Sequence, residues 1–261
     1  MRVMTMNLNG IRSAADKGFF TWMRKQDVDV LCLQEVRAPR EPMTRAMSAP
    51  RGYHAHYHLA ERPGYAGVGL WLKAPADRVV AGMGIPEVDR EGRFLQADFG
   101  KLSVVSWYMP SGSSGPERQA WKYVVMGHVF RHLGALVAEG RELVVAGDWN
   151  IAHQPIDLEN WRSNQKNSGF LPDERAWLDR VFAELGLVDV FRRLDPAPRR
   201  YTWWSNRGAA RDKNVGWRLD YQLVTPGVAA RATAVTIETK RRFSDHAPVS
   251  FDYVGPVGHD G

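Results

Sequence analysis

Short apolar runs bounded by turn residues recur along the whole chain, and they constrain its fold more than any other feature. The runs cover residues 2–6, 30–33, 68–72, 102–109, 143–146, 219–224 and 248–253. Several are apolar at nearly every position, which is typical of strands that are buried on both faces of a sheet. The pattern predicts sheets that other elements cover on both sides.

Two longer segments between these runs have the period of a helix, residues 117–139 and 172–185. The second begins at Pro172 and is followed by Gly186, residues that favour a helix start and a helix end. Its apolar stripe consists of Trp177, Leu178, Val181, Phe182 and Leu185. We find no linker or internal repeat, so we expect one α/β domain over residues 1–255 and a short tail over 256–261.

Polar side chains lie next to the apolar runs, at positions where packing does not require them. They are Asn7, Asn9, Gln34, Glu35, Tyr108, Asp148, Asn150, Asp220, Asp245 and His246. Each has an ordinary explanation when taken alone, such as a turn former or a helix cap. Strand ends are, however, where α/β proteins assemble active sites, so the whole set predicts one.

The chemistry of this set points to a metal-assisted hydrolase. Carboxylate and amide oxygens suit Mg²⁺ or Mn²⁺, and the chain has no cysteine cluster that favours a softer metal. The imidazole of His246 follows a carboxylate, and a second carboxylate is able to orient it. Hydrolysis of a phosphodiester needs an activated water, charge neutralisation and help for the leaving oxygen, which such residues supply.

The positive charge is concentrated in one segment. The chain has a net charge of +6, and residues 192–242 contain 12 Lys and Arg against four Asp and Glu. A solvated basic face is one explanation, and a polyanionic partner is the other. Ten tryptophans, several of them within this segment, favour nucleic acid. The residues that we expect to contact phosphate are Arg207, Arg211, Lys213 and Arg218.

Other features of the sequence favour a protein of a reducing compartment and argue against a membrane protein. Cys32 has no disulfide partner in the chain, and we expect it to pack as a small hydrophobe. No run approaches the ~18 apolar residues of a membrane span, and the first residues lack the apolar core of a signal peptide. We therefore expect a cytoplasmic protein. The alternating His54, His56 and His58 would share one strand face, as a transition-metal site or, as we expect, a solvated face.

Six motifs occur along the chain, within a resemblance that extends from Met1 to about Tyr253: MNLNGIRSA, LQEVR, GDWNIAH, NSGFLPDER, GWRLDYQLV and FSDHAPV. In this order they resemble the exonuclease III family of apurinic/apyrimidinic (AP) endonucleases, within the endonuclease-exonuclease-phosphatase superfamily. The resemblance implies a deoxyribonuclease-I-like four-layer α/β sandwich, in which two β-sheets are flanked by helices. It also implies a DNA-repair enzyme that cleaves duplex DNA 5′ to an abasic site, with Mg²⁺ as cofactor and Mn²⁺ as a substitute. Side activities on blocked 3′ ends, as a 3′-phosphodiesterase or 3′–5′ exonuclease, and a monomeric state are part of the same expectation.

The resemblance assigns a metal site to part of the polar set. Glu35 would be the principal ligand, with Asn9 nearby and Asp245 at the same site. The remaining members of the implied metal site are Asp148, Asn150 and His246.

The resemblance also assigns catalytic roles. Asp148 would orient or deprotonate the attacking water, and two asparagines would align Asp148 and the phosphate. Tyr108 would contact the phosphate or assist the leaving group, and His246, polarised by Asp220, would bind the scissile phosphate. The implied catalytic set is Asn7, Tyr108, Asp148, Asn150, Asp220 and His246.

The segment YTWWSNRGAARDKNVGWRLDY is similar to the eukaryotic members of this family, in which three apolar residues form a pocket for a sugar without its base. Trp203, Trp217 and Leu219 match those positions. Core packing is the alternative for all three. The chain departs from the family at two positions: Trp203 is bulkier than the common Phe, and Ser111 replaces an Asn that would contact phosphate.

Two other functions remain open from the sequence. Lipid and inositol-phosphate phosphodiesterases of the same superfamily share the Glu, Asp and Ser-Asp-His chemistry, so the motifs alone do not name a substrate. The chain has no apolar hairpin of the kind expected for a lipid enzyme. A non-catalytic DNA-binding relative would lack at least one ligand, and none is missing from this sequence.

Overall fold

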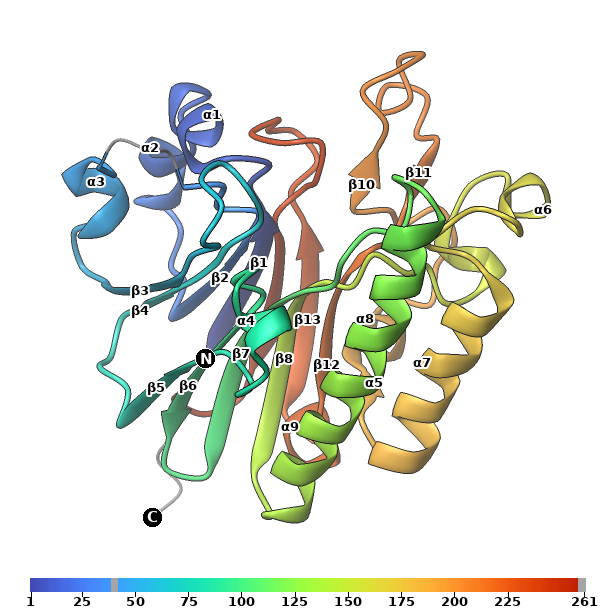
Figure 1. Ribbon diagram of the computed structural model, residues 1–261. Coiled ribbons are helices and arrows are strands. Elements are labelled where there is room, and N and C mark those ends of the chain that lie inside the picture. Colours follow the sequence, from blue (N-terminus) through green and yellow to red (C-terminus); the bar gives the residue numbers. More distant parts are fainter. Residues whose placement is uncertain (39–41, 258–261) are drawn as a thin grey trace.

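Two six-stranded sheets lie face to face in the computed structural model, which describes residues 1–38 and 42–257 (Figure 1). The first sheet has the order β13–β14–β1–β2–β4–β3. Its strands are β1 (Arg2–Asn7), β2 (Val30–Gln34), β3 (His54–His58), β4 (Val68–Leu72), β13 (Ala232–Ile237) and β14 (Val249–Tyr253). Residues 258–261 of the expected tail lie outside the described residues.

The second sheet has the order β5–β6–β7–β8–β12–β9. Its strands are β5 (Arg78–Ala81), β6 (Phe94–Phe99), β7 (Leu102–Tyr108), β8 (Glu142–Asp148), β9 (Val188–Asp189) and β12 (Asp220–Val224). A separate two-stranded ribbon is formed by β10 (Trp203–Trp204) and β11 (Gly216–Trp217), and the loop between them projects from the body of the protein (Figure 1).

Helices cover the outer faces of both sheets. Two short helices, α1 (Ile11–Asp16) and α2 (Phe19–Met23), pack on the first sheet, and α5 (Pro116–Ala138) and α7 (Pro172–Leu185) pack side by side on the second (Figure 1). The others are α3 (Arg45–Ser48), α4 (Pro86–Asp89), α6 (Trp161–Asn164), α8 (Val190–Leu194), α9 (Pro226–Ala230) and a 3₁₀ turn at Pro155–Asp157. Among the described residues, no helix is both long enough and apolar enough to cross a membrane.

The expected four-layer sandwich is confirmed, and it explains why the strand runs are apolar at nearly every position. Successive side chains of a strand point to opposite faces. In β7, Val104 packs in the core between the sheets, and Val105 packs in the core beneath α5 and α7. Both side chains are fully buried. Cys32 is buried between the sheets as a small apolar residue, as expected.

Besides the histidine-rich strand β3 and the two-residue strands β9, β10 and β11, the strands β5, β6 and β13 fall outside the apolar runs that the sequence shows. Polar residues interrupt β6, but they are buried in pairs: Gln96 Nε2 donates to Asp98 Oδ1 at 2.7 Å, and Ser103 Oγ also donates to that oxygen at 2.7 Å. β5 and β13 lie at sheet edges, where one face is solvated and the apolar signal is weak.

The topology brings six strand ends to one edge of the sandwich. β1 is parallel to β2, and β7 is parallel to β8, so these strands end on the same side. β14 is antiparallel to β1, and β12 is antiparallel to β8, so their first residues lie beside those ends. The polar residues that follow or precede these strands therefore meet, although they are far apart in the sequence.

Candidate active site

A cavity of about 690 Å³ opens at this edge, and most of the expected site residues line it. Its walls include Asn9, Glu35, Tyr108, Ser111, Asp148, Asn150, Trp203, Trp217, Leu219, Asp245 and His246. Asn7 and Asp220 are fully buried directly behind the lining residues that they contact. The structure thus brings the polar set together, except for Gln34, which is buried and bonds to Thr5 and Ser106 instead.

Sharp backbone turns aim three of these side chains into the cavity. Asn9, Glu35 and Asn150 each follow the end of a strand, and their φ angles are 47°, 48° and 50°. Residues other than glycine rarely adopt this left-handed conformation because the Cβ atom crowds the backbone. Such residues gather at functional sites, where the surrounding structure maintains the strain.

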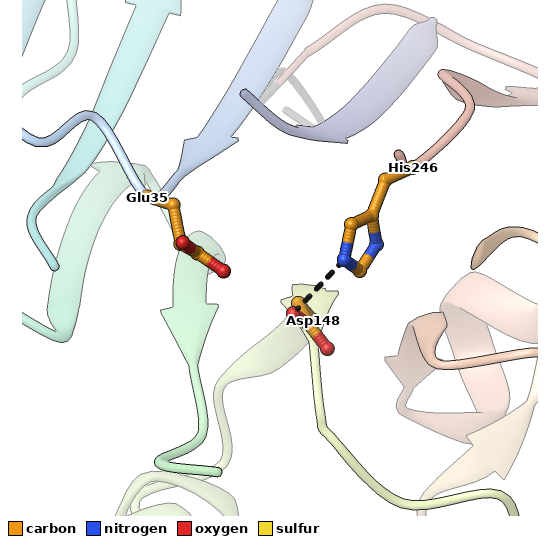
Figure 2. A group of neighbouring side chains, drawn as sticks. All are labelled: Glu35, Asp148 and His246. Atoms are coloured by element: carbon orange, nitrogen blue, oxygen red, sulfur yellow. Dashed lines mark ion pairs between the residues drawn. The ribbon is translucent and has the colours of Figure 1, made fainter. Parts of the chain in front are cut away.

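Asn7 joins the two carboxylates of the site. Its Nδ2 donates to Glu35 Oε1 at 2.7 Å and to Asp148 Oδ2 at 2.9 Å. One ligand-type atom from each of Glu35, Asp148 and His246 lies within 4.8 Å of the others, and Figure 2 shows the three side chains converging. The carboxylates of Glu35 and Asp148 are hard oxygen donors that suit a divalent cation of the Mg²⁺ type, so these two residues fit the metal that the family implies.

A second carboxylate orients the histidine. His246 Nδ1 lies 2.9 Å from Asp220 Oδ2, and its Nε2 lies 3.7 Å from Asp148 Oδ2, beyond a normal hydrogen bond (Figure 2). Burial alone lowers the pKa of an imidazole, but the carboxylates of Asp220 and Asp148 outweigh burial and raise the pKa of His246. The raised pKa favours the protonated ring, which faces the cavity and has no lone pair for a metal, so the expected role of His246 as a metal ligand stays a prediction.

The environment of Asp148 suits a general base. Burial raises the pKa of this carboxyl group to about 7; the carboxylates of Asp220 and Glu35 add to that rise, and His246 opposes it. Asn150 N donates to Asp148 Oδ1 at 2.9 Å, which fixes the plane of the carboxylate. A base with a pKa near the working pH is effective in proton transfer.

Asp245 lies at the side of the cavity, bound to its neighbours. Asn9 Nδ2 donates to Asp245 Oδ1 at 2.9 Å, and Trp203 Nε1 donates to Asp245 Oδ2 at 3.1 Å. Among the described acidic and histidine side chains, Asp245 is not part of the tight group of Glu35, Asp148 and His246. The expected roles of Asn9 and Asp245 as metal ligands remain predictions.

Tyr108 is the last residue of β7 and lies near the carboxylates of Glu35 and Asp148. Burial is the first cause that raises the pKa of its hydroxyl well above the usual value, and the charge of Glu35 is the second. The guanidinium of Arg93 lies 4.6 Å from the centre of the Tyr108 ring, and Arg93 Nη1 donates to Tyr108 O at 3.2 Å. The hydroxyl is therefore protonated at neutral pH and is available as a donor.

An apolar wall adjoins the polar group. Trp203 and Trp217 pair across the β10–β11 ribbon, with ring centres 6.3 Å apart and nearly perpendicular planes. Leu219 is buried in the same cluster, and Phe170 packs edge-on against Trp217 at 6.5 Å. The three expected pocket residues thus lie together on one side of the cavity, with Phe170 behind them.

One expected DNA contact is wrong. Arg218 is fully buried: its Nε donates to Asp157 Oδ1 at 2.8 Å and its Nη2 to Asp189 Oδ2 at 2.7 Å. An arginine in this position has no access to a phosphate. Its charge is instead neutralised by two carboxylates, which fix β12 beside the cavity.

The other three basic residues differ in exposure. Arg207 and Lys213 are exposed on the projecting loop between β10 and β11. Arg211 is half-buried: its Nη1 donates to Ser244 O at 3.0 Å, its Nη2 donates to Arg241 O at 2.9 Å, and its guanidinium lies over the Trp204 ring. Arg211 therefore supports the loop that carries Asp245 and His246. Its expected phosphate contact remains a prediction.

Sequence reasoning gave no role to several residues of the site. Arg37 forms an ion pair with Glu35, and Phe170 supports Trp217. Both occur within motifs that we identified, LQEVR and NSGFLPDER, so their position in those motifs was the available signal.

His54, His56 and His58 lie on edge strand β3, and His58 Nδ1 lies 2.9 Å from Phe94 O. Among the described residues, they are not part of a metal-binding group.

Comparisons with known proteins agree with this geometry. Residues 4–246 match the Endonuclease/Exonuclease/phosphatase family. An exodeoxyribonuclease of Bacillus subtilis is 32% identical over 255 residues, which cover 95% of this chain and 98% of that protein. A DNA repair nuclease of Danio rerio is 34% identical, over 96% of this chain and 81% of that protein. The solved structure of an AP endonuclease from Archaeoglobus fulgidus superposes with a TM-score of 0.87 at 28% identity, over 98% of this chain and 100% of that one.

Proposed function

This chain belongs to the Endonuclease/Exonuclease/phosphatase family, and we propose that it hydrolyses duplex DNA on the 5′ side of an abasic site. The single observation that carries the proposal is the union of two features in one cavity. The group of Glu35, Asp148 and His246 supplies the chemistry of phosphodiester hydrolysis, and the wall of Trp203, Trp217 and Leu219 supplies an apolar pocket beside it. A deoxyribose without its base presents an apolar ring face that such a wall is able to accept.

The chain's own residues account for the expected reaction. Asp148, held by Asn7 and by the Asn150 amide, orients a water molecule and accepts its proton. The His246 cation, held by Asp220, binds a phosphate oxygen, and the Tyr108 hydroxyl faces the same space. A divalent cation, for which we propose Mg²⁺ held principally by Glu35, would neutralise charge that develops on the phosphate.

We also propose activity on blocked 3′ ends, as a 3′-phosphodiesterase or 3′–5′ exonuclease, and action as a monomer in a reducing compartment such as the cytoplasm. The buried, unpaired Cys32 is consistent with that compartment. Solved relatives with this fold include a 3′-5′ exonuclease from Neisseria meningitidis, which is 25% identical with a TM-score of 0.87.

The test compares three substrates with and without Mg²⁺. They are a duplex with one tetrahydrofuran abasic analogue, the matched undamaged duplex, and an inositol polyphosphate. We expect Mg²⁺-dependent incision at the analogue, no internal incision of the undamaged duplex apart from removal of nucleotides at its 3′ ends, and little hydrolysis of the inositol polyphosphate. Preferential hydrolysis of the inositol phosphate would instead support the lipid or inositol-phosphate alternative. Tight DNA binding with no cleavage under any metal would support the non-catalytic alternative.

A further inference from the structure

A lysine–glutamate pair is buried beneath the cavity. Lys122 lies on α5 and Glu174 lies in the first turn of α7, and both side chains are completely inaccessible to solvent. Lys122 Nζ donates to Glu174 Oε1 at 2.6 Å. Burying two charges removes their hydration, which the attraction between them barely offsets, so an apolar pair of similar size would serve stability equally well. Stability is therefore a poor explanation for this pair.

The lysine holds the backbone of a site residue. Lys122 Nζ also donates to the carbonyl oxygen of Asn150 at 2.7 Å. Asn150 has a left-handed backbone (φ 50°) and donates its own N–H to Asp148 Oδ1 and its Nδ2 to Met109 O at 2.8 Å. Because a carbonyl held on one side fixes the adjacent peptide plane, Lys122 restrains a conformation that the residue does not favour by itself.

The glutamate holds the apolar wall. Glu174 Oε2 accepts from Gly169 N at 2.7 Å and from Leu171 N at 3.0 Å, and its Oε1 also accepts from Gln119 Nε2 at 3.0 Å. A Cβ atom on Gly169 would lie 3.2 Å from both Asn150 O and a ring carbon of Trp217. The segment that Glu174 holds is thus packed tightly between Asn150 and the wall of the pocket.

We propose that Lys122 and Glu174 form a positioning pair that sets Asn150, and through it Asp148, in register with the Trp217 side of the pocket. Neither residue lines the cavity, so neither touches the substrate. The inference rests on the proposed function in one respect, that Asp148 and the pocket act on the same DNA substrate. Displacement of a reacting group by about 1 Å costs on the order of 10² in rate, so loss of either anchor should be visible in turnover.

Three variants separate positioning from stability. Lys122→Met removes both bonds of the lysine and leaves Glu174 charged and buried. Glu174→Gln keeps the shape of the side chain, but an amide has only one oxygen, so it is unable to accept the hydrogen bonds that reach both carboxylate oxygens of Glu174. The double variant removes the buried charge, so it should recover thermal stability relative to Lys122→Met, yet it still lacks the bond to Asn150.

We expect kcat on the abasic duplex to fall roughly 10- to 100-fold in Lys122→Met and in the double variant, with KM and DNA affinity within about threefold of the wild type. Arg141→Met is the matched control, because it breaks a partly buried ion pair with Asp98. Asp98 lies beside the first residues of β7, at the end of that strand away from the cavity. The control should lose stability without losing kcat. If kcat in the double variant recovers together with the melting temperature, the pair acts on stability alone and the inference is wrong.

A second readout does not depend on the substrate. In ¹⁵N-labelled protein, Glu174→Gln should accelerate hydrogen exchange of the Gly169 amide, and Lys122→Met should shift the amide signals of Asn150 and Ile151. Unchanged Asn150 signals in a folded Lys122→Met variant would overturn the inference even if the enzyme is active. Failure of the wild type to incise abasic DNA, with these shifts present, would instead overturn the proposed function and leave the positioning pair intact.

Discussion

Asp220 and Asp148 face each other as register partners across two antiparallel strands, the first residue of β12 opposite the last residue of β8. This pairing explains how His246 comes between two carboxylates, because its Nδ1 contacts Asp220 and its Nε2 points toward Asp148. A shift of one residue in that register would move one of the carboxylates to the other face of the sheet. The catalytic geometry is therefore a property of strand pairing as well as of loop conformation.

Asp220→Asn and His246→Ala should each lower the incision rate by roughly 10² to 10⁴, the range that is typical of a positioned orienting or proton-transfer group. Because Asp220 touches the imidazole and does not line the cavity, it should act through His246. The double variant should then be little slower than the slower single variant. Single-turnover incision of an abasic duplex measures all three. Losses that multiply would contradict the assignment of Asp220.

Glu35→Ala should abolish Mg²⁺-dependent cleavage while DNA affinity changes little. The carboxylate holds a cation whose effect is greatest in the transition state, and most of the affinity for the duplex comes from other contacts. Glu184→Ala, which removes an exposed carboxylate near the end of α7, is the matched control and should cleave normally. Incision assays with varied Mg²⁺ and fluorescence anisotropy separate the two effects. Normal cleavage by Glu35→Ala would refute the ligand assignment.

DNA binding should weaken steeply with salt, and the exposed residues of the projecting loop should account for part of the slope. Replacing Arg207 or Lys213 with Ala should reduce the magnitude of the slope of log K against log salt by about 0.9 per lost phosphate contact. Arg180→Ala, which removes an exposed arginine on α7, is the control and should leave the slope unchanged. Anisotropy titrations over a range of salt provide the measurement. A flat salt dependence in the wild type would show that the segment is only a solvated face.

The buried ion pair of Arg218 and Asp157 should make the free energy of unfolding depend on pH in the acid range. Burial alone would raise the pKa of Asp157, but Arg218 and Arg192 outweigh burial and lower it to about 2. A carboxylate with a lowered pKa stabilises the fold above the unfolded pKa of about 4, and this stabilisation disappears as the pH falls toward 2. Asp157→Asn should thus lose about 2 kcal/mol of unfolding free energy at pH 7, and the difference from the wild type should narrow at pH 3. Urea unfolding at both pH values tests this, and an equal difference at both would disprove it.

The outcome for Arg218 illustrates what a sequence shows and what it hides. The strands of the apolar runs, the two long helices and the polar residues at strand ends follow from local patterns, because burial on both faces and helix period can be recognised from neighbouring residues. The acidic group was therefore predictable as a set. Arg218 looked like a surface cation because it lies in a basic, tryptophan-rich segment. Its partner Asp157 is 61 residues away in the sequence, and no local pattern reports that pairing.

The same limit applies to the residues beneath the cavity. Lys122 and Glu174 lie 52 positions apart on two helices, and each resembles an ordinary charged residue on a solvated helix face. Only the packing of α5 beside α7 brings them together. The supporting residues at strand ends, Asn7 and Asp220, were predictable with the polar set, whereas the supporting residues on helices were not.

Trp217→Ala should impair abasic-site incision more than exonuclease action on undamaged ends, because it removes one wall of the proposed sugar pocket and leaves the acidic group intact. Loss of such a packed apolar surface costs on the order of a few kcal/mol, which slows incision by about two decades or more if the contact tightens in the transition state. Trp203 lies 6.3 Å away and is able to move into the gap, which would reduce the loss.

The measurement for Trp217→Ala is therefore a ratio of the two activities in one preparation, with folding checked by thermal melting. Trp121→Ala is the matched control, because Trp121 is a partly buried residue of α5 that packs against the core beneath this helix and does not line the cavity. It should leave the ratio of incision to exonuclease activity unchanged. Phe170 and Gly169 pack against Trp217, so some loss of stability is expected in the variant, but lost stability lowers both activities equally. A ratio in Trp217→Ala equal to that of the wild type would return this tryptophan to a role in core packing alone.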